Sequence, residues 1–345
     1  MDICNKFNIK GKYISYEILT SGHINTTYKI NFEDNSYILQ KINTYVFKKP
    51  IEVMNNIYNI TSHIKNKLIK KNKEYKRYVL DFKECNNKPY FYEDDKTFWR
   101  CYTFIDNSIT FNQTDNLKVI EESGKAFGTF QNLLSDFPVK NLNIVLPHFH
   151  NTVNRYELFK ESIKNNYSNR KEEVMDLINE YLSLEEIATK MYKMQKEEKL
   201  PLRVTHNDTK CNNVLFDKDT LNHLAVIDLD TVMPGLVGFD FGDAIRFIAN
   251  TSSEDEKDLD KVTLDLDKYN AFYNGFTSVL KDKLTQIEID TLPLGAITMT
   301  VECGMRFLTD YLDGDKYFKI NYPDHNLVRS KCQLRLAKEM INIIC

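Results

Sequence analysis

Two short polar segments carry the residue types that phosphoryl transfer requires. The first reads HNDTKCNN at positions 206–213, and the second reads IDLD at positions 227–230. Phosphoryl transfer needs a carboxylate that orients and deprotonates the attacking hydroxyl, ligands for Mg²⁺, and groups that hold the phosphates. Asp208 is the candidate base, and Asn213 and Asp228 supply oxygen ligands of the kind that Mg²⁺ prefers.

Short strands are expected to position these side chains. Residues 213–216 and 223–229 are apolar runs separated by a turn-forming segment, Asp-Lys-Asp-Thr, at 217–220. Acids and amides stand at the ends of both runs, where side chains leave a sheet and become available to a ligand. This arrangement predicts a base and two metal ligands around one point.

The first hundred residues predict strands with one long helix. Alternation of apolar and polar residues predicts a hairpin over 26–42, and helical spacing predicts a helix from Pro50 to about Lys70. Further strands are expected at 78–82, 90–92 and 98–105.

The remainder predicts helices, with apolar stripes at 116–134 and 172–198 and a mostly helical stretch over the last eighty residues. The predicted elements change from mostly strands to mostly helices near residues 106–112, which predicts two domains, 1–106 and 107–345.

Composition excludes several classes of function. The chain has 345 residues and a formal charge of −3, so no nucleic-acid-binding surface is implied. No apolar stretch of 18 residues suggests a membrane span, and the first residues do not resemble a signal peptide. The seven scattered cysteines are expected to be reduced thiols, which suits a cytoplasmic protein.

The two polar segments resemble the His-x-Asp…Asn loop and the Ile-Asp strand of the aminoglycoside phosphotransferase and choline kinase superfamily. Further segments, at 22–28, 37–40, 239–247, 302–312, 317–318 and 325–329, are similar to the N-acetylhexosamine 1-kinases within it. The resemblance implies an α+β, two-lobed, protein-kinase-like fold, with a small N-terminal antiparallel β lobe containing one helix and a larger, mostly helical C-terminal lobe. It also implies ATP and Mg²⁺ as co-substrate and cofactor, and phosphorylation of N-acetylglucosamine (GlcNAc) or N-acetylgalactosamine (GalNAc) at the anomeric hydroxyl.

The resemblance also implies roles for single residues. Asp208 would be the catalytic base in contact with the substrate, and Asn213 and Asp228 the metal ligands. ATP would be bound by Gly22, Asn25, Thr26, Thr27, Gln40 and the hinge residue Phe104. The sugar would be bound by Arg306 and Tyr317, with His23, Ile24 and Phe247 as weaker candidates.

The third strand carries an unusual residue. The superfamily places a phosphate-binding lysine where this sequence has Gln40, and a lysine follows at position 41. Because side chains alternate along a strand, Gln40 and Lys41 must lie on opposite faces. We expect Gln40 to face the nucleotide as a neutral hydrogen-bond donor and Lys41 to point away.

Several other polar residues have structural interpretations. His206 is expected to brace the loop, and Asp230 and Asp240 are expected to act as caps more often than as ligands. The pair His148 and His150 lacks an obvious third metal ligand. The acids Asp310, Asp313 and Asp315 fit either a cation-binding patch for an aminoglycoside or a solvated helix end, and Tyr311 and Phe318 are expected in the core.

Two alternative functions remain open. One is a kinase of the same fold that acts on an aminoglycoside, choline or another sugar. The other is a non-catalytic nucleotide-binding module, which the intact Asp208, Asn213 and Asp228 disfavour. The expected partners are a small sugar and ATP, with no nucleic acid and no membrane, and the sequence does not determine the oligomeric state.

Overall fold

The computed structural model describes residues 2–19, 24–93 and 97–344. The chain forms two compact units. The first contains residues 1–110, 133–145 and 214–234, and the second contains residues 111–132, 146–213 and 235–345. The first unit therefore takes in two segments from beyond residue 110.

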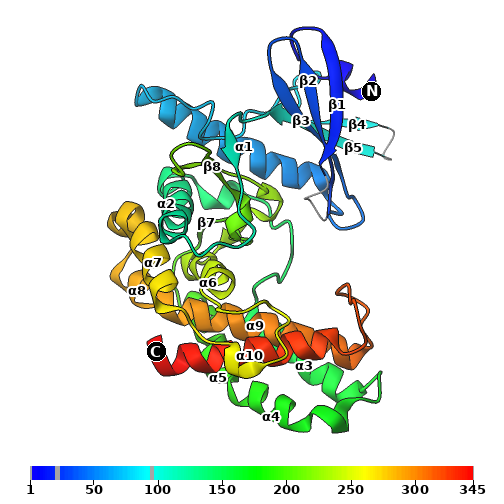
Figure 1. The fold of residues 1–345 in the computed structure, drawn as a ribbon, viewed down its shortest axis with the longest axis vertical. Helices are drawn as coiled ribbons and strands as arrows, with labels where there is room; N and C mark the ends of the chain where they lie inside the picture. Colours follow the sequence, from blue (N-terminus) through cyan, green and yellow to red (C-terminus); the bar gives the residue numbers. More distant parts are fainter. Residues whose placement is uncertain (1, 20–23, 94–96, 345) are drawn as a thin grey trace. The chain divides into compact units, whose positions relative to one another are not determined.

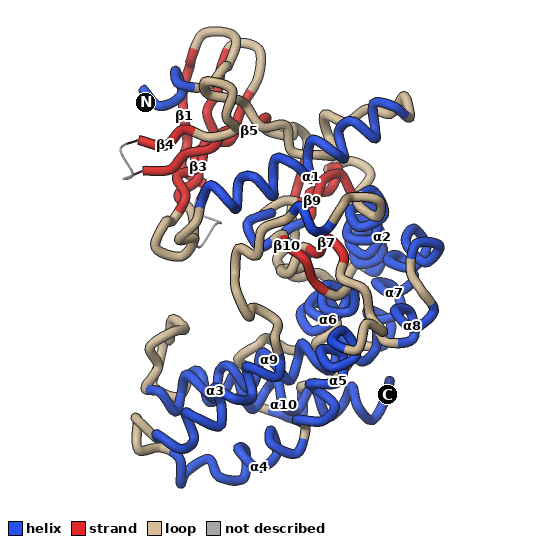
Figure 2. Tube along the Cα trace, turned by 180° about the vertical axis from the view of Figure 1, so that it is seen from behind, coloured by secondary structure: helices blue, strands red, loops and turns tan. Residues whose placement is uncertain are grey.

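The first unit is built on a five-stranded sheet in the order β1-β2-β3-β5-β4, whose strands pair antiparallel (Figures 1 and 2). The strands are β1 (Tyr13–Leu19), β2 (Thr26–Phe32), β3 (Ser36–Ile42), β4 (Phe91–Glu93) and β5 (Thr97–Thr103). The hairpin predicted over 26–42 is confirmed as β2 and β3. The strand predicted at 78–82 is wrong, because only Phe82 makes an isolated bridge, to Tyr102.

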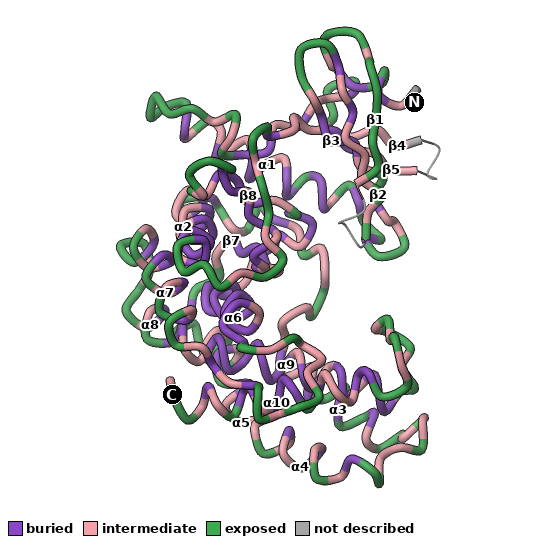
Figure 3. The backbone as a smooth tube through the Cα atoms, viewed as in Figure 1, coloured by how far each residue is buried: buried purple, intermediate pink, exposed green. Residues whose placement is uncertain are grey.

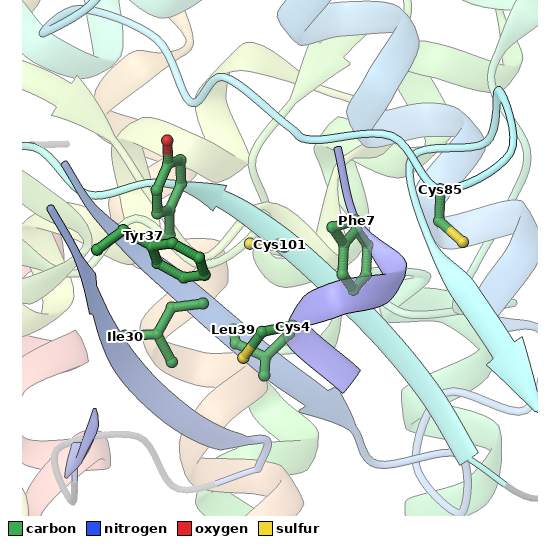
Figure 4. Packing of buried hydrophobic residues seen from close by; sticks show 8 residues of the cluster. Cys4, Phe7, Ile30, Tyr37, Leu39, Cys85 and Cys101 are labelled. Carbon is green, nitrogen blue, oxygen red and sulfur yellow. The ribbon is translucent and has the colours of Figure 1, made fainter. Parts of the chain in front are cut away.

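A hydrophobic cluster covers one face of this sheet. Ile30, Leu39 and Cys101 are buried there together with Cys4 and Phe7 of the 3₁₀ helix η1 (Asp2–Lys6), as Figure 4 shows. Ile30 lies between Lys29 and Asn31, and Cys101 lies between Arg100 and Tyr102, so burial of one face at these positions favours a single register of pairing.

The long helix predicted in the first unit is confirmed as α1 (Pro50–Lys70). It begins at a proline, which is favoured at the first helical position. Val53, Met54, Ile57 and Ile60 are buried at helical spacing.

The segment 214–234 supplies two strands of a second, small sheet in the order β6-β8-β9, and the strand β6 comes from residues 1–110. Its strands are β6 (Ser108–Ile109), β8 (Val214–Asp217) and β9 (His223–Val226), followed by η5 (Leu229–Thr231). The unit also contains η2 (Val139–Asn141), and β10 (Met233–Gly235) ends in the second unit.

The second unit is mostly helical, as the sequence predicts. It contains α2 (Leu117–Leu133), α3 (Thr152–Asn165), α4 (Met175–Ser183), α5 (Glu185–Lys196), α6 (Val237–Ile248), α7 (Leu266–Leu280), α8 (Gln286–Asp290), α9 (Leu292–Asp313) and α10 (His325–Ile344), with β7 (Arg203–Thr205), η3 (Lys171–Val174), η4 (Cys211–Asn213), η6 (Leu259–Lys261) and η7 (Lys281–Lys283). The stripe predicted at 172–198 is divided into η3, α4 and α5, with a break at Leu184.

Helix α6 lies at the centre of the second unit and packs against α9 (Figure 3). Every residue of α6 except Phe247 is buried. The two helices approach closely because both have glycine at the contact. A Cβ on Gly242 would lie 2.2 Å from the backbone oxygen of Gly295.

No helix in the described part of the chain is long and apolar enough to cross a membrane. The six cysteines within the described residues are free thiols. The α+β class expected from the sequence is confirmed, with an antiparallel sheet and one long helix in the first unit and mostly helices in the second.

Candidate active site

The predicted base Asp208 lies in a loop of the second unit between β7 and η4. Its Oδ1 lies 2.8 Å from the Nζ of Lys210, and the side chain is 27% exposed. The Nδ2 of Asn213 donates to the backbone oxygen of Asp208 at 2.8 Å and to its Oδ2 at 3.2 Å. The carboxylate is thus oriented from two sides and still reachable from solvent.

Two carboxylates of α6 hold this loop. Asp240 accepts hydrogen bonds from the backbone N–H groups of His206 and Asn207, both at 2.8 Å, and from the Nε2 of Gln131 at 2.6 Å. Asp243 accepts from the backbone N–H of Thr209 at 3.1 Å. Asp240 therefore has a structural role, but it holds this loop and does not cap its own helix, whose N-cap residue is Leu236.

His206 braces the loop, as predicted. Its ring is completely buried, with centroid distances of 5.5 Å to Phe127 and 6.0 Å to Phe130. Its Nδ1 accepts a hydrogen bond from the backbone N–H of Asp208 at 3.3 Å.

The backbone just before the base has a left-handed conformation. Asn207 has φ of 65°, which asparagine tolerates better than most residues. Its Oδ1 accepts from the hydroxyl of Thr205 at 3.1 Å, and a Cβ on Gly235 would come within 3.0 Å of the same oxygen. Glycine at 235 therefore leaves room for the turn that presents Asp208.

The charged side chains next to Asp208 alternate in sign, from Lys210 to Asp243 and then to Arg246. Burial acts to lower the pKa of Lys210, but Asp208 and Asp243 outweigh it and the pKa is raised, so the ammonium keeps its charge. Burial likewise acts to raise the pKa of Asp243, and Arg246 and Lys210 lower it instead. Arg246 also pairs with Glu254 at 2.8 Å.

The predicted metal ligand Asp228 lies in the first unit, at the start of η5, with φ of 57°. Two residues later, Asp230 is buried and forms an ion pair with the Nη1 of Arg100 on β5. The Nη2 of Arg100 donates to the second oxygen of Asp230 at 3.2 Å, and the Nδ2 of Asn25 donates to that oxygen at 2.7 Å. Asp230 is therefore occupied by protein groups.

Gln40 of β3 continues this network. It pairs with Arg100 across β3 and β5, and its Oε1 accepts from the Nε of Arg100 at 2.8 Å. Its Nε2 donates to the hydroxyl of Thr27 at 3.0 Å. The amide expected to bind phosphate is engaged with Arg100 and Thr27, while the Nζ of Lys41 lies 6.0 Å from the centroid of the Trp99 ring.

The nucleotide candidate Gly22 and the sugar candidate His23 lie outside the described residues. The sugar candidate Ile24 is 49% exposed, and the nucleotide candidate Thr26 begins β2. The backbone N–H of Phe104 donates to the oxygen of Ser36 at 3.0 Å, so this N–H is already used within the sheet.

Arg100 is the residue that sequence reasoning missed. A signal was present, because an arginine inside a run of aromatic and apolar strand residues needs a buried partner. The partner is 130 positions away, and no local pattern reveals it.

Arg306 on α9 lies among aromatic rings in the second unit. Its guanidinium carbon is 5.9 Å from the centroid of Phe149, 5.9 Å from that of Tyr317 and 5.5 Å from that of Phe318. Tyr317 is 73% exposed. The structure thus brings the two main sugar candidates together, and Phe318 lies with them, although it was expected in the core; Tyr311 is buried as expected.

A buried carboxylate lies close to this cluster. Glu302 accepts from the Nδ1 of His150 at 3.1 Å, and its Oε1 is 4.0 Å from the Nε of Arg155. Burial acts to raise the pKa of Glu302, but His150, Arg306 and Arg155 lower it. His150 is thus a structural partner of Glu302, in line with the structural interpretation of His148 and His150.

The acids at the end of α9 are structural. Asp310 accepts from the backbone N–H groups of Lys316, Tyr317 and Phe318 at 2.8–2.9 Å and so fixes the loop that carries Tyr317. Asp315 pairs with Arg170 at 2.5 Å. Both acids lie at the end of α9 and in the turn after it, but their side chains are buried and are not solvated as the sequence suggested.

Phe247 lies in a different environment. It lines a cavity of about 270 Å³ whose other lining residues are mostly amides and hydroxyls, including Asn112, Asn250 and Ser252. Neither Arg306 nor Tyr317 lines it.

The predicted metal ligands fit a hard cation in their chemistry. Asn213 uses its Nδ2 to hold Asp208, which leaves its Oδ1 as the side-chain oxygen for a ligand, and Asp228 supplies a carboxylate. Such oxygens suit Mg²⁺, which usually completes its shell with water and phosphate oxygens. Within the described ranges, no group of three or more His, Cys, Asp or Glu residues could hold a metal by itself.

Several solved structures are similar to this chain in fold. Among solved structures, an aminoglycoside phosphotransferase from Alicyclobacillus acidocaldarius is 9% identical, with a TM-score of 0.64 over 98% of this chain and 94% of that chain. A choline kinase from Cryptosporidium parvum is 17% identical, with a TM-score of 0.56 over 97% and 92%. A spectinomycin phosphotransferase in complex with ADP and spectinomycin is 13% identical, with a TM-score of 0.53 over 96% and 94%.

These structural likenesses establish the fold. The sequence pattern of the phosphotransferase enzyme family matches residues 15–262, which include most of the five-stranded sheet, the loop of Asp208 and the strand before Asp228. The chain therefore belongs to the phosphotransferase enzyme family.

Proposed function

We propose that the protein is an ATP- and Mg²⁺-dependent kinase that phosphorylates the anomeric hydroxyl of N-acetylhexosamines such as GlcNAc and GalNAc. The observation that carries the choice of acceptor is the environment of Arg306. A guanidinium between aromatic rings suits a neutral polyol, because its planar fork can hold two hydroxyls while a ring face covers the sugar.

The charges around Arg306 disfavour a cationic acceptor. Burial and the neighbouring Arg306 lower the pKa of Arg155. The guanidiniums of Arg155 and Arg306 both act on one carboxylate, that of Glu302, and lower its pKa. Asp310 and Asp315 are already bound to backbone N–H groups and to Arg170. Choline and aminoglycosides would therefore meet no surplus of negative charge at this place.

In the proposed reaction, Asp208 accepts the proton of the anomeric hydroxyl as its oxygen attacks the γ-phosphorus of ATP. The new oxygen–phosphorus bond forms while the bond between that phosphorus and the β–γ bridging oxygen breaks, giving the sugar 1-phosphate and ADP. A hemiacetal hydroxyl is more acidic than an ordinary alcohol, so a carboxylate can serve as its base.

Other groups would hold the reactants in place. Asn213 and Asp228 would bind Mg²⁺, which supplies charge neutralisation at the phosphates. Asn25, Thr26 and Thr27 begin the strand that would lie over the nucleotide, and residues 1–106 would form the nucleotide-binding domain. The ammonium of Lys210, 2.8 Å from the carboxylate of Asp208, would keep that group oriented between turnovers.

The test is an acceptor panel with position-specific product analysis. GlcNAc, GalNAc, glucose, choline and kanamycin are incubated with Mg²⁺ and ATP, and ³¹P and ¹H NMR identify the phosphorylated position. We expect α-1-phosphates of GlcNAc and GalNAc, and no turnover of methyl N-acetylglucosaminide, whose anomeric oxygen is capped. Phosphorylation of the methyl glycoside, a 6-phosphate product or a preference for choline or kanamycin would overturn the proposal.

A further inference from the structure

The buried ion pair between Arg100 and Asp230 has no part in the reaction described so far. Both side chains are almost inaccessible, with exposed fractions of 4% and 3%. Burial acts to lower the pKa of Arg100, but Asp230 outweighs it and the pKa is raised, so the pair is a true ion pair inside the first unit. Desolvation makes such pairs weak stabilisers, whereas a buried pair can fix local geometry.

The pair belongs to a continuous set of hydrogen bonds. Thr27 accepts from Gln40, Gln40 accepts from Arg100, and Arg100 donates to both oxygens of Asp230. Asn25 donates to Asp230 as well, and its Oδ1 accepts from the backbone N–H of Asn43 at 3.0 Å. Three strands of the sheet are thereby tied to η5.

The short helix η5 is also fixed at its other end. The Nδ2 of Asn56, a fully buried residue of α1, donates to the backbone oxygen of Val232 at 2.9 Å. Between these two anchors, Leu229 is buried. The segment therefore has little freedom, and the left-handed conformation of Asp228 directly before it is held in place.

Asp228 lies within electrostatic range of Arg100 and is among the groups that raise its pKa. The guanidinium on β5 thus contributes positive charge near the predicted metal ligand, in a sheet whose third strand has Gln40 where a lysine is expected. Gln40 orients Arg100 by accepting a hydrogen bond from the Nε of Arg100. The Nη1 and Nη2 of Arg100 then donate to Asp230.

We propose that Arg100 is a positioning residue that, through Asp230, fixes Asp228 for binding of the Mg²⁺·ATP complex. Gln40 contributes to the same positioning by orienting the guanidinium of Arg100. The proposal rests on the proposed function in one respect, namely that Asp228 is a metal ligand.

The test measures nucleotide binding with and without metal by isothermal titration calorimetry. The variants are Arg100→Lys, Arg100→Met, the double variant Arg100→Met with Asp230→Leu, and Asp228→Asn. The matched control is Lys65→Met, which removes a half-buried cation paired with Asp81 in the same unit. Circular dichroism establishes that each variant is folded, and the double variant removes both charges so that no unpaired one remains.

We expect Arg100→Met and the double variant to weaken Mg²⁺·ATP binding tenfold or more and to change ATP binding in EDTA less than threefold. Arg100→Lys should lie between these variants and the wild type, and Lys65→Met should match the wild type. A folded double variant with wild-type affinity for Mg²⁺·ATP would overturn the proposal, as would equal weakening with and without metal.

The Asp228→Asn variant distinguishes failure of the positioning role of Arg100 from failure of the metal-ligand assignment in the proposed function. If it weakens Mg²⁺·ATP binding while the Arg100 variants do not, only the positioning role is wrong. If it leaves Mg²⁺·ATP binding unchanged, the assignment of Asp228 as a metal ligand in the proposed function is wrong.

Discussion

The loop after β9 in the first unit is held by a charged group, whereas the loop after β7 in the second unit is held mainly by uncharged donors. Asp230 receives the guanidinium of Arg100, while Asp240 receives two backbone N–H groups and the amide of Gln131. Burial raises the pKa of Asp240 because hydrogen bonds and the nearby His206 offset only part of the desolvation.

This difference has a consequence for how each loop keeps its shape. The second unit relies on backbone geometry, including the left-handed Asn207, to place its base. The first unit relies on an ion pair that crosses from the sheet to η5. Substitutions that remove one charge while keeping size should therefore separate the contributions of the two loops.

The largest effect is expected from the base of the second unit. Asp208→Asn keeps the shape of the side chain but removes the proton acceptor, so kcat should fall by roughly 10²–10⁴. A coupled ADP-release assay with GlcNAc measures the change. A kcat within threefold of the wild type would show that the reaction needs no base at this position.

A smaller effect is expected at the sugar candidate of the second unit. Arg306→Lys keeps the positive charge but loses the planar fork, so the KM for GlcNAc should rise about tenfold or more. Steady-state kinetics with each substrate varied in turn also gives the KM for ATP, which should stay nearly unchanged. Equal changes in both constants would indicate a folding role for Arg306.

On β3 of the first unit, two neighbouring substitutions should differ. Lys41 lies beside Trp99, so Lys41→Ala should change the KM for ATP less than threefold, roughly 0.6 kcal/mol. Gln40→Ala removes the acceptor for the Nε of Arg100 and should raise that KM several times more. If Lys41→Ala loses ATP binding while Gln40→Ala behaves as the wild type, then Lys41, and not Arg100, supplies the positive charge of the first unit on which ATP binding depends.

The smallest effect is expected at a carboxylate outside both loops. The pKa of Asp217 is lowered from 3.8 to about 2, by hydrogen bonds from Thr220 and by Arg77. Because the pKa is lower in the folded state, this stabilisation is fully present above pH 4 and is lost as the pH falls through 2.

Asp217→Asn should therefore lower the Tm by a few degrees at pH 7 and by less at pH 3, as differential scanning calorimetry can measure. A difference that stays constant between these pH values would contradict the ionic origin of the effect.

Local patterns predicted much of both units. The helix at 50–70 and the hairpin at 26–42 follow from periodicity and turn residues, and the motif around Asp208 identified the loop held by α6. The strand predicted at 78–82 failed because a short apolar run does not determine pairing.

The network of Arg100 could not be predicted, because its members, at positions 25, 40, 100 and 230, meet only through tertiary structure. Strand alternation indicates the face of the sheet on which Gln40 lies, but it does not reveal that Arg100 is its partner on β5. Likewise, Arg306 and Tyr317 are brought together because Asp310 fixes the loop at 316–318, which no sequence pattern indicates.

The most direct test of the division of roles between the two units is a side-by-side titration of Mg²⁺·ATP into Asp208→Asn and Asp228→Asn. We expect Asp208→Asn to bind Mg²⁺·ATP as the wild type does, and Asp228→Asn to bind it more weakly, with partial recovery in excess Mg²⁺. Equal loss of binding in both variants, with no recovery by Mg²⁺, would contradict the assignment of the base to one unit and a metal ligand to the other.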